Sequence, residues 1–102
     1  MSFKKILFVF FLIFSSSAFA DSKMELGLEI YNNKARCGVC HTLRAAGSLG
    51  DIGPNLDQLK SQTETIISVV TYGIGVMPAF EDILTTKEIE AIAYYLFNST
   101  NE

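Results

Sequence analysis

Apolar residues recur every three or four positions in three stretches of the chain, a spacing that predicts amphipathic helices. Each stretch begins just after a serine or threonine that is followed three residues later by glutamate, the pattern of a capping box. No segment alternates long enough to predict a strand, so we expect an all-α chain. The predicted helices run from about Lys23 to Lys34, from about Gln62 to Tyr72 and from about Thr86 to Asn98, and begin after Ser22, Ser61 and Thr85.

The same spacing predicts which side chains face the core. The second helix is the least secure of the three, because residues 65–72 are rich in β-branched side chains and a strand is the alternative there. The predicted inward positions are Leu26, Gly27, Ile30 and Tyr31 in the first helix, Ile66, Val69 and Val70 in the second, and Ile89, Ile92, Ala93 and Leu96 in the third.

Residues 1–20 have the form of a secretory signal peptide. Lys4 and Lys5 precede an unbroken apolar run over residues 6–14, and Ala18-Phe19-Ala20 forms an A-x-A cleavage site. The apolar run is too short to span a bilayer comfortably, so we expect cleavage and no stable membrane insertion; an uncleaved anchor is the alternative. Cleavage leaves residues 21–102 as one small domain in an exported compartment.

The acidic charge of the chain narrows the classes of partner that it is expected to bind. The full chain carries a net charge of −3. Cleavage removes Lys4 and Lys5 and no acidic residue, so the mature chain stands near −5. This excess argues against a nucleic acid or an anionic membrane surface as partner. It suits docking to a positively charged protein surface, although simple solubility explains it equally well.

One five-residue stretch carries the clearest chemical signal. Cys37-Gly38-Val39-Cys40-His41 reads C-x-x-C-H, the attachment signature of a c-type haem. Two thiols at this spacing can add to the two vinyl groups of one porphyrin edge, and His41 can then donate an imidazole nitrogen to the iron. A redox dithiol and half of a zinc site are the alternatives. Zinc is disfavoured because the chain has no further Cys or His.

Two later loops extend this signal. Gly53-Pro54-Asn55-Leu56 follows the C-x-x-C-H stretch, and Met77-Pro78 lies in a glycine-containing loop over residues 73–80. With these motifs in this order, the chain resembles the small monohaem class I c-type cytochromes of bacteria, over essentially all of residues 21–102. The resemblance implies three main helices packed around one covalently bound haem c.

The resemblance also implies a role for each motif residue. Cys37 and Cys40 would form the thioether bonds. His41 and Met77 would be the two axial ligands of the iron. The carbonyl of Pro54 would accept a hydrogen bond from the His41 ring, which fixes its orientation and raises its basicity. In addition, Gly27 and Tyr31 of the first helix would cross the last helix near Tyr95; read without the family, these three are ordinary core residues.

The choice of Met77 has support from its surroundings. Met24 lies on the predicted first helix, where a methionine is usually a filler of the core. Met77 lies in a glycine-containing loop beside Pro78, where the backbone can bring its sulfur to a metal. A thioether opposite histidine favours the reduced iron and closes the sixth position, which suits electron transfer.

The chain departs from the family pattern in three respects. Only 22 residues separate Pro54 from Met77, so the long loop of mitochondrial-type relatives is missing. Five residues separate Tyr31 from Cys37, more than the family spacing, so a loop or a longer first helix must absorb the difference. The chain also has no Trp, so partners of the haem propionates cannot be carried over; Arg44, Lys60 and Tyr72 are the candidates.

The sequence thus predicts a periplasmic electron carrier that is not itself an enzyme. A periplasmic dehydrogenase would be its donor, and an oxidase or another cytochrome its acceptor. The motifs look most like those of cytochromes that serve periplasmic sulfite dehydrogenases, as partner or as subunit. Two alternatives remain: a haem-bound enzyme or sensor with an open sixth position, and a C-x-x-C dithiol oxidoreductase without haem.

Overall fold

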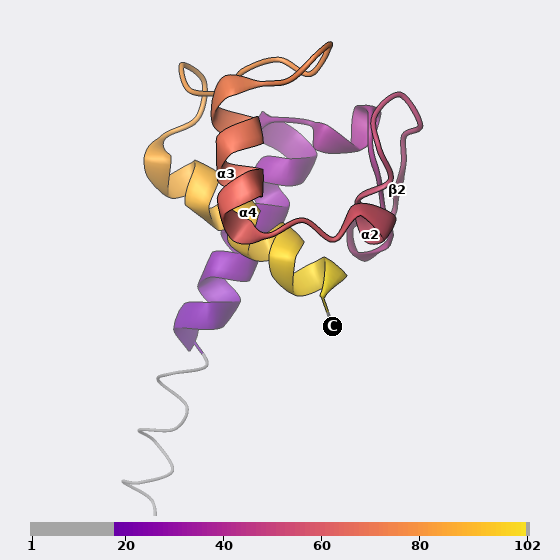
Figure 1. Ribbon diagram of the computed structural model, residues 1–102. Coiled ribbons are helices and arrows are strands. Elements are labelled where there is room, and N and C mark those ends of the chain that lie inside the picture. The colour runs from indigo at the N-terminus through magenta and orange to yellow at the C-terminus, as the bar shows by residue number, and fades with distance from the viewer. Residues whose placement is uncertain (1–17, 102) are drawn as a thin grey trace, which may run out of the picture.

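The computed structural model describes residues 18–101, which form a mostly helical domain (Figure 1). The predicted signal peptide therefore lies outside the described residues, except for residues 18–20, which are helical. Across the described part, the structure contains no helix that is both long and apolar enough to cross a bilayer. In chain order it has a helix over 18–29, η1 (Ile30–Lys34), η2 (Cys37–Val39), β1 (Thr42–Leu43), η3 (Arg44–Ala46), β2 (Ser48–Leu49), α2 (Leu56–Leu59), α3 (Thr63–Tyr72) and α4 (Thr86–Thr100).

The capping-box prediction is confirmed for α4. The Thr85 hydroxyl accepts a hydrogen bond from the Glu88 amide at 3.2 Å, and the Glu88 carboxylate accepts one from the Thr85 amide at 2.9 Å. These reciprocal bonds satisfy two amides that the first helical turn leaves without partners. The sequence therefore specifies the start of this helix.

The other two predicted caps are wrong. Gln62, one residue after Ser61, is the N-cap of α3, and the helix begins with the bond from Ile66 N–H to Gln62 C=O. The buried pair Ile66 and Val70 sets the rotation of α3, so packing overrides the local cap signal. Ser22 lies inside a helix that is already present at residue 18, because the residues before it continue the helical backbone.

A π-helical turn absorbs the long spacing between Tyr31 and Cys37. In η1 the Ala35 amide donates to the carbonyl of Ile30, five residues earlier, at 2.8 Å. A bond of this span holds one more residue per turn than an α-helix does. The first helix therefore extends to Lys34, as predicted, while the turn takes up additional chain before the C-x-x-C-H stretch.

Helix α4 lies at the centre of the core. It packs against α3 and crosses the N-terminal helix (Figure 1). Residues 65–72 are helical, so the strand alternative is wrong; the apolar face of this segment decides its structure over its β-branched content. Most of the predicted inward positions are buried: Gly27, Ile30, Tyr31, Ile66, Val70, Ile89, Ile92, Ala93 and Leu96.

A small hairpin and one extra helical turn were not predicted. Strands β1 and β2 pair antiparallel, with Thr42 opposite Leu49 and Leu43 opposite Ser48. Two-residue strands are too short to show alternation in the sequence. Helix α2 is a single turn, capped by the Asn55 side chain, which accepts from the amides of Asp57 and Gln58. The hairpin follows the C-x-x-C-H stretch directly, and α2 follows the G-P-N-L stretch's first three residues.

Candidate haem site

The C-x-x-C-H stretch folds as a tight turn. Arg36, in the left-handed region at φ 55°, turns the chain from η1 into η2. The carbonyl of Cys37 accepts bonds from the amides of Cys40 at 3.1 Å and His41 at 3.0 Å. The turn therefore fixes the relative positions of the two thiols and the histidine before any group is bound.

The thiol of Cys37 does not have the chemistry of a redox dithiol. Cys37 and Cys40 are free and partly buried. Burial raises the pKa of Cys37 to about 11. Dithiol oxidoreductases depend on a thiolate whose pKa is lowered by its surroundings. The environment of Cys37 therefore speaks against the haem-free oxidoreductase.

The imidazole of His41 is held from two sides. Its Nδ1 lies 2.6 Å from the carbonyl oxygen of Pro54, which accepts the ring proton. A Cβ atom on Gly53 would lie 2.5 Å from Cε1 of the ring, so only glycine fits there. With Nδ1 protonated and bonded to Pro54, Nε2 is the nitrogen left to bind a metal.

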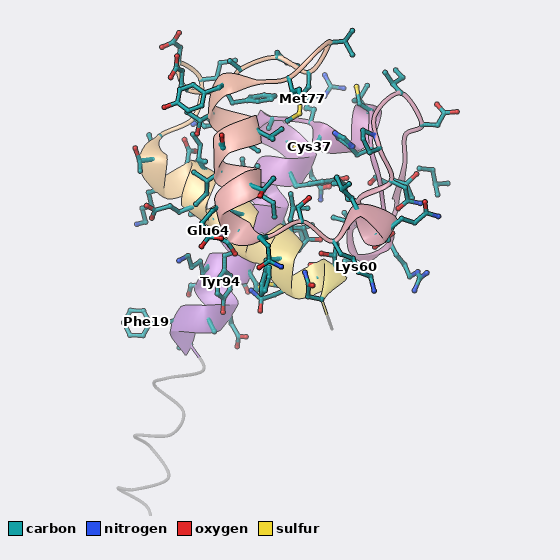
Figure 2. All side chains as sticks on the ribbon, in the orientation of Figure 1. Phe19, Cys37, Lys60, Glu64, Met77 and Tyr94 are labelled. Carbon is teal, nitrogen blue, oxygen red and sulfur yellow. The ribbon has the colours of Figure 1, made fainter. Side chains whose placement is uncertain are left out.

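Met77 lies in a tight hairpin between α3 and α4. The amides and carbonyls of Ile74 and Met77 bond to each other at 2.9 and 3.2 Å, around Gly75 at φ +55°. Gly73, at φ +74°, lies so close that an added Cβ would be 2.6 Å from the Met77 carbonyl oxygen. Met77 lies at the same end of the molecule as Cys37 (Figure 2). Met24 lies on the N-terminal helix; like Met77, it is partly buried against the core.

Large apolar side chains stay exposed along the part of the chain that runs from the C-x-x-C-H stretch to the Met77 hairpin. Most of the large hydrophobic side chains that the structure exposes lie between positions 39 and 76, from the middle of the motif to the residue before Met77. Scattered single exposures are ordinary, but exposed apolar side chains that lie together can form a surface that binds something apolar. A porphyrin plate held by Cys37 and Cys40 fits that requirement. The residues are Val39, Leu49, Ile52, Leu59, Tyr72, Ile74 and Val76.

Comparison with known proteins decides the family. A family model described as cytochrome c oxidase, cbb3-type, subunit III, matches residues 22–96. The chain belongs to the c-type cytochromes. This cytochrome is 29% identical to cytochrome c6 of Bryopsis maxima over 89 residues, which cover 78% of this chain and 94% of that protein. It is 31% identical to the chloroplastic cytochrome c6 of Chlamydomonas reinhardtii over 98 residues, covering 86% of this chain and 61% of that protein.

A solved structure shows the same fold. The c-type cytochrome SorU from Sinorhizobium meliloti is 45% identical and superposes with a TM-score of 0.75, covering 80% of this chain and 95% of that one. The predicted class I cytochrome fold is thereby confirmed. Members of the family carry covalent haem c, and Cys37 and Cys40 fit its attachment motif. The cytochrome is an electron carrier that works with redox-partner proteins, and the haem-free dithiol alternative is wrong.

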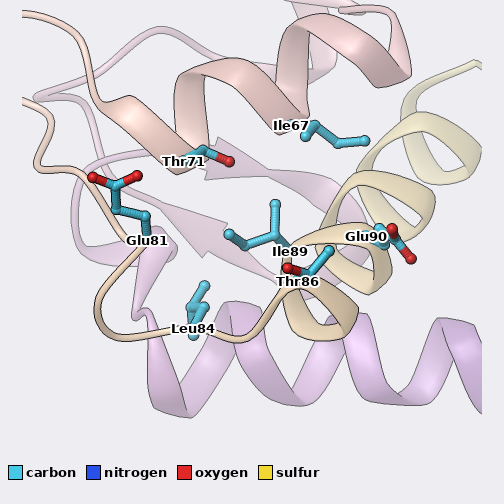
Figure 3. Close-up of a pocket in the computed structure, with 7 residues that line it drawn as sticks. All are labelled: Ile67, Thr71, Glu81, Leu84, Thr86, Ile89 and Glu90. Atoms are coloured by element: carbon cyan, nitrogen blue, oxygen red, sulfur yellow. The ribbon is translucent and has the colours of Figure 1, made fainter.

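A groove between α3 and α4 is separate from this site. It has a volume of about 240 Å³ and an apolar floor, with Glu81 and Glu90 at opposite ends (Figure 3). None of the cysteines, His41, Pro54 or Met77 is among the described residues that line it. Its lining is Ile67, Thr71, Glu81, Leu84, Thr86, Ile89 and Glu90.

The propionate candidates are all exposed on the surface of the cytochrome. Arg44 is exposed in η3, Lys60 is exposed at the end of α2 in a left-handed conformation, and Tyr72 ends α3 with 70% of its surface exposed. The roles of all three stay predictions.

Sequence reasoning missed two residues that touch His41. Gly53 packs on the ring, and the hydroxyl of Ser48 donates to the carbonyl of His41 at 3.0 Å. Gly53 could have been suspected as the first residue of the G-P-N-L stretch. Ser48 had no signal, because its contact depends on a hairpin too short to predict.

Proposed function

We propose that this cytochrome carries single electrons in the periplasm, with its haem iron bound by His41 and Met77. Haem c supplies an iron that takes up and releases one electron. The observation that carries the proposal is the 2.6 Å contact between His41 Nδ1 and the Pro54 carbonyl, because it fixes a proximal ligand and its tautomer. The hairpin that holds Met77 supports its role as the second, distal ligand of the iron.

Both proposed ligands stay in place during the redox cycle. His41 is restrained by Pro54 on one ring edge and by Gly53 on its face. The backbone of Met77 is restrained by its two bonds to Ile74. Ligands that do not move keep the reorganisation on electron transfer small and deny small molecules a coordination position. We therefore favour electron transfer over the haem-bound enzyme or sensor.

Export and partner choice belong to the same proposal. Residues 1–20 are the proposed signal peptide, and the mature chain begins at Asp21 and carries a net charge near −5. We propose a periplasmic dehydrogenase as donor, with a sulfite dehydrogenase as the first to test, and an oxidase or another cytochrome as acceptor. The support for a sulfite dehydrogenase is the likeness of the C-x-x-C-H, G-P-N-L and M-P stretches to cytochromes that serve such enzymes.

The ligand test compares two methionines of the oxidised cytochrome. Met77→Ala is expected to abolish the weak near-infrared sulfur-to-iron band, to let the reduced protein bind carbon monoxide and to lower the reduction potential, because a thioether favours the ferrous iron. Met24→Ala is the matched control and should leave band and potential unchanged. It should lower the free energy of unfolding by less than the cost of a fully buried methionine, which is about 2–5 kcal/mol, because Met24 is only partly buried. Carbon monoxide binding by the wild type would favour the open-site alternative.

The partner test is kinetic. A purified periplasmic sulfite dehydrogenase, turning over sulfite, should reduce the wild-type cytochrome at a rate that falls as salt is added, because the charge of the cytochrome steers encounter. If reduction is slow at all salt concentrations, the donor is another dehydrogenase. The mass of the exported protein decides the cleavage site independently.

A further inference from the structure

Ser48 joins two parts of the cytochrome that are far apart in sequence. Its hydroxyl oxygen lies 2.8 Å from the hydroxyl of Tyr31 and 3.0 Å from the carbonyl oxygen of His41. A carbonyl can only accept, and a serine hydroxyl has one proton to give. The directions follow: Tyr31 donates to Ser48, and Ser48 donates to His41.

The hairpin explains why Ser48 reaches the haem motif. Ser48 lies on β2 opposite Leu43, so β2 folds back over the residues that follow His41. A Cβ atom on Gly38, between the two cysteines, would lie 2.7 Å from Cβ of Ser48. An added Cβ on Gly50 would lie 2.6 Å from the His41 amide nitrogen. The hairpin therefore rests directly on the motif at two glycines.

The other end of this chain of hydrogen bonds lies in the helix crossing. Tyr31 is fully buried, and its ring packs against Tyr95 with 6.2 Å between centroids and a tilt of 59°. Burial raises the pKa of Tyr31 to about 12, so its hydroxyl keeps its proton at any working pH. The Tyr31 hydroxyl, which donates the first of these hydrogen bonds, thus always carries its proton and is held in a fixed position.

We propose that Ser48 is a positioning residue for the proximal histidine, relaying the fixed position of Tyr31 to the backbone of His41. This inference rests on the proposed role of His41 as an iron ligand. Pro54 holds the ring of His41 and Ser48 holds its backbone, so the direction of Nε2 is fixed from both ends. The bond to Pro54 alone leaves the backbone of His41 free to shift, and the bond from Ser48 alone leaves its ring free to rotate.

The reduction potential should report the role of Ser48. Without its hydroxyl, the backbone of His41 has more freedom and the bond from Nδ1 to Pro54 weakens. An imidazole that gives up this bond is a less basic ligand and stabilises the ferric iron less. Loss of the Ser48 hydroxyl should therefore raise the potential.

The test uses the haem-loaded cytochrome and four variants. Ser48→Ala should raise the equilibrium constant for reduction about two- to tenfold, the size expected for one hydrogen bond, and shift the proton resonances of the His41 ring. Tyr31→Phe should act in the same direction and less strongly. The double variant should match Ser48→Ala, because Tyr31 acts through Ser48. Thr42→Val is the matched control, since it removes a hairpin hydroxyl that bonds to the Gly50 carbonyl at 2.9 Å and not to His41.

The outcomes separate this proposal from the ligand assignment. If the wild type lacks the signals of an iron-bound histidine, the proposed function fails. If those signals are present and Ser48→Ala moves neither them nor the potential, the role of Ser48 is refuted. Equal shifts in Thr42→Val would assign the effect to the hairpin as a whole, which also refutes it. Should Ser48→Ala not load haem, an unshifted potential in Tyr31→Phe overturns the proposal by itself.

Discussion

The backbone of Gly27 contacts the side chain of Tyr95 where the first helix crosses α4. A Cβ atom on Gly27 would lie 2.4 Å from Cβ of Tyr95 and 2.4 Å from the carbonyl oxygen of Ala91. Real Cβ atoms do not approach other atoms this closely, so the crossing at this distance requires glycine. The expected contact of Gly27 and Tyr31 with α4 near Tyr95 is present in the structure.

Gly27→Ala should therefore destabilise the cytochrome. Alanine improves helix propensity by about 1 kcal/mol, but forcing the two backbones apart costs typically 1–3 kcal/mol, and here both neighbours are rigid. The rigid neighbours place this cost at the upper end, about 2–3 kcal/mol, so we expect a net loss of about 1–2 kcal/mol in the free energy of unfolding, measured in urea. The control is Glu25→Ala on an exposed position of the same helix, which should change stability by less than about 0.5 kcal/mol.

Gly53→Ala should disturb the histidine rather than the fold. The new Cβ would lie 2.5 Å from Cε1 and 2.9 Å from Nδ1 of His41, so the ring must turn away from Pro54. We expect shifted His41 ring resonances and a raised reduction potential, because the imidazole loses basicity with its bond to Pro54. Unchanged ring resonances would mean that the ring has room that the structure does not show.

Gly47→Ala provides the contrast. Gly47 has φ +67°, and among the described residues nothing lies within 4 Å of an added Cβ. Alanine there costs about 1–2 kcal/mol of backbone strain without a clash. Stability should fall while the His41 resonances stay where they are.

The ion pair between Lys34 and Glu88 should be visible in an acid titration. The Lys34 ammonium donates to both carboxylate oxygens of Glu88, at 2.9 and 2.8 Å. These bonds, followed by the bond from the Thr85 amide, lower the pKa of Glu88. The stability they give is present above the pKa of an unfolded glutamate and is lost as pH falls through the lower folded value.

Lys34→Met should accordingly raise the pKa of Glu88, as followed by NMR of its carboxyl carbon. The shift should shrink in high salt, because the pair is at the surface. Lys87→Met removes a charge next to Glu88 in sequence without removing a bonded partner. A rise of the same size in both variants would show that the effect is general charge and not the observed pair.

The raised pKa of Tyr31 predicts that the folded cytochrome loses stability at alkaline pH. Burial, its largest cause, raises the pKa of Tyr31 from 10.0 to about 12. Below pH 10 the hydroxyl is protonated in both the folded and the unfolded chain, so the full stability is present. Between pH 10 and about 12 the unfolded chain releases this proton and the folded chain keeps it, so stability falls by up to about 2–3 kcal/mol.

Urea unfolding from pH 8 to 12 measures this effect. Tyr31→Phe should remove most of the alkaline decline, although Tyr95, whose pKa burial also raises, adds to it in the same direction. Tyr72→Phe removes an exposed tyrosine and should leave the pH dependence as it is. An alkaline decline that persists unaltered in Tyr31→Phe would contradict the assignment.

The parts of the fold that depend on periodicity could be predicted from the sequence. The apolar positions of α4 recur over four turns, and its cap is a local bond between Thr85 and Glu88, so both were readable. The start of α3 was misplaced because the packing of Ile66 and Val70, and not Ser61, determines it. Local rules succeed where the stabilising contacts are themselves local.

The residues of the haem site likewise divide into those that a local sequence pattern predicts and those that it does not. The C-x-x-C-H stretch identified the cofactor because thioether chemistry needs that spacing within five residues. Ser48 could not be found, since its bonds reach back 7 residues to His41 and 17 to Tyr31 through a hairpin of two-residue strands. No pattern along the chain encodes those contacts.

The π-helical turn of η1 gives this small cytochrome a tolerance in chain length. The turn lies between the Gly27 crossing and the cysteines, and its bond from Ala35 N–H to Ile30 C=O encloses one residue more than a regular turn. An extra residue between crossing and motif is thus confined to a single irregular turn. A small protein whose core and attachment motif share the same few helices can vary in length there and leave the crossing and the motif in place.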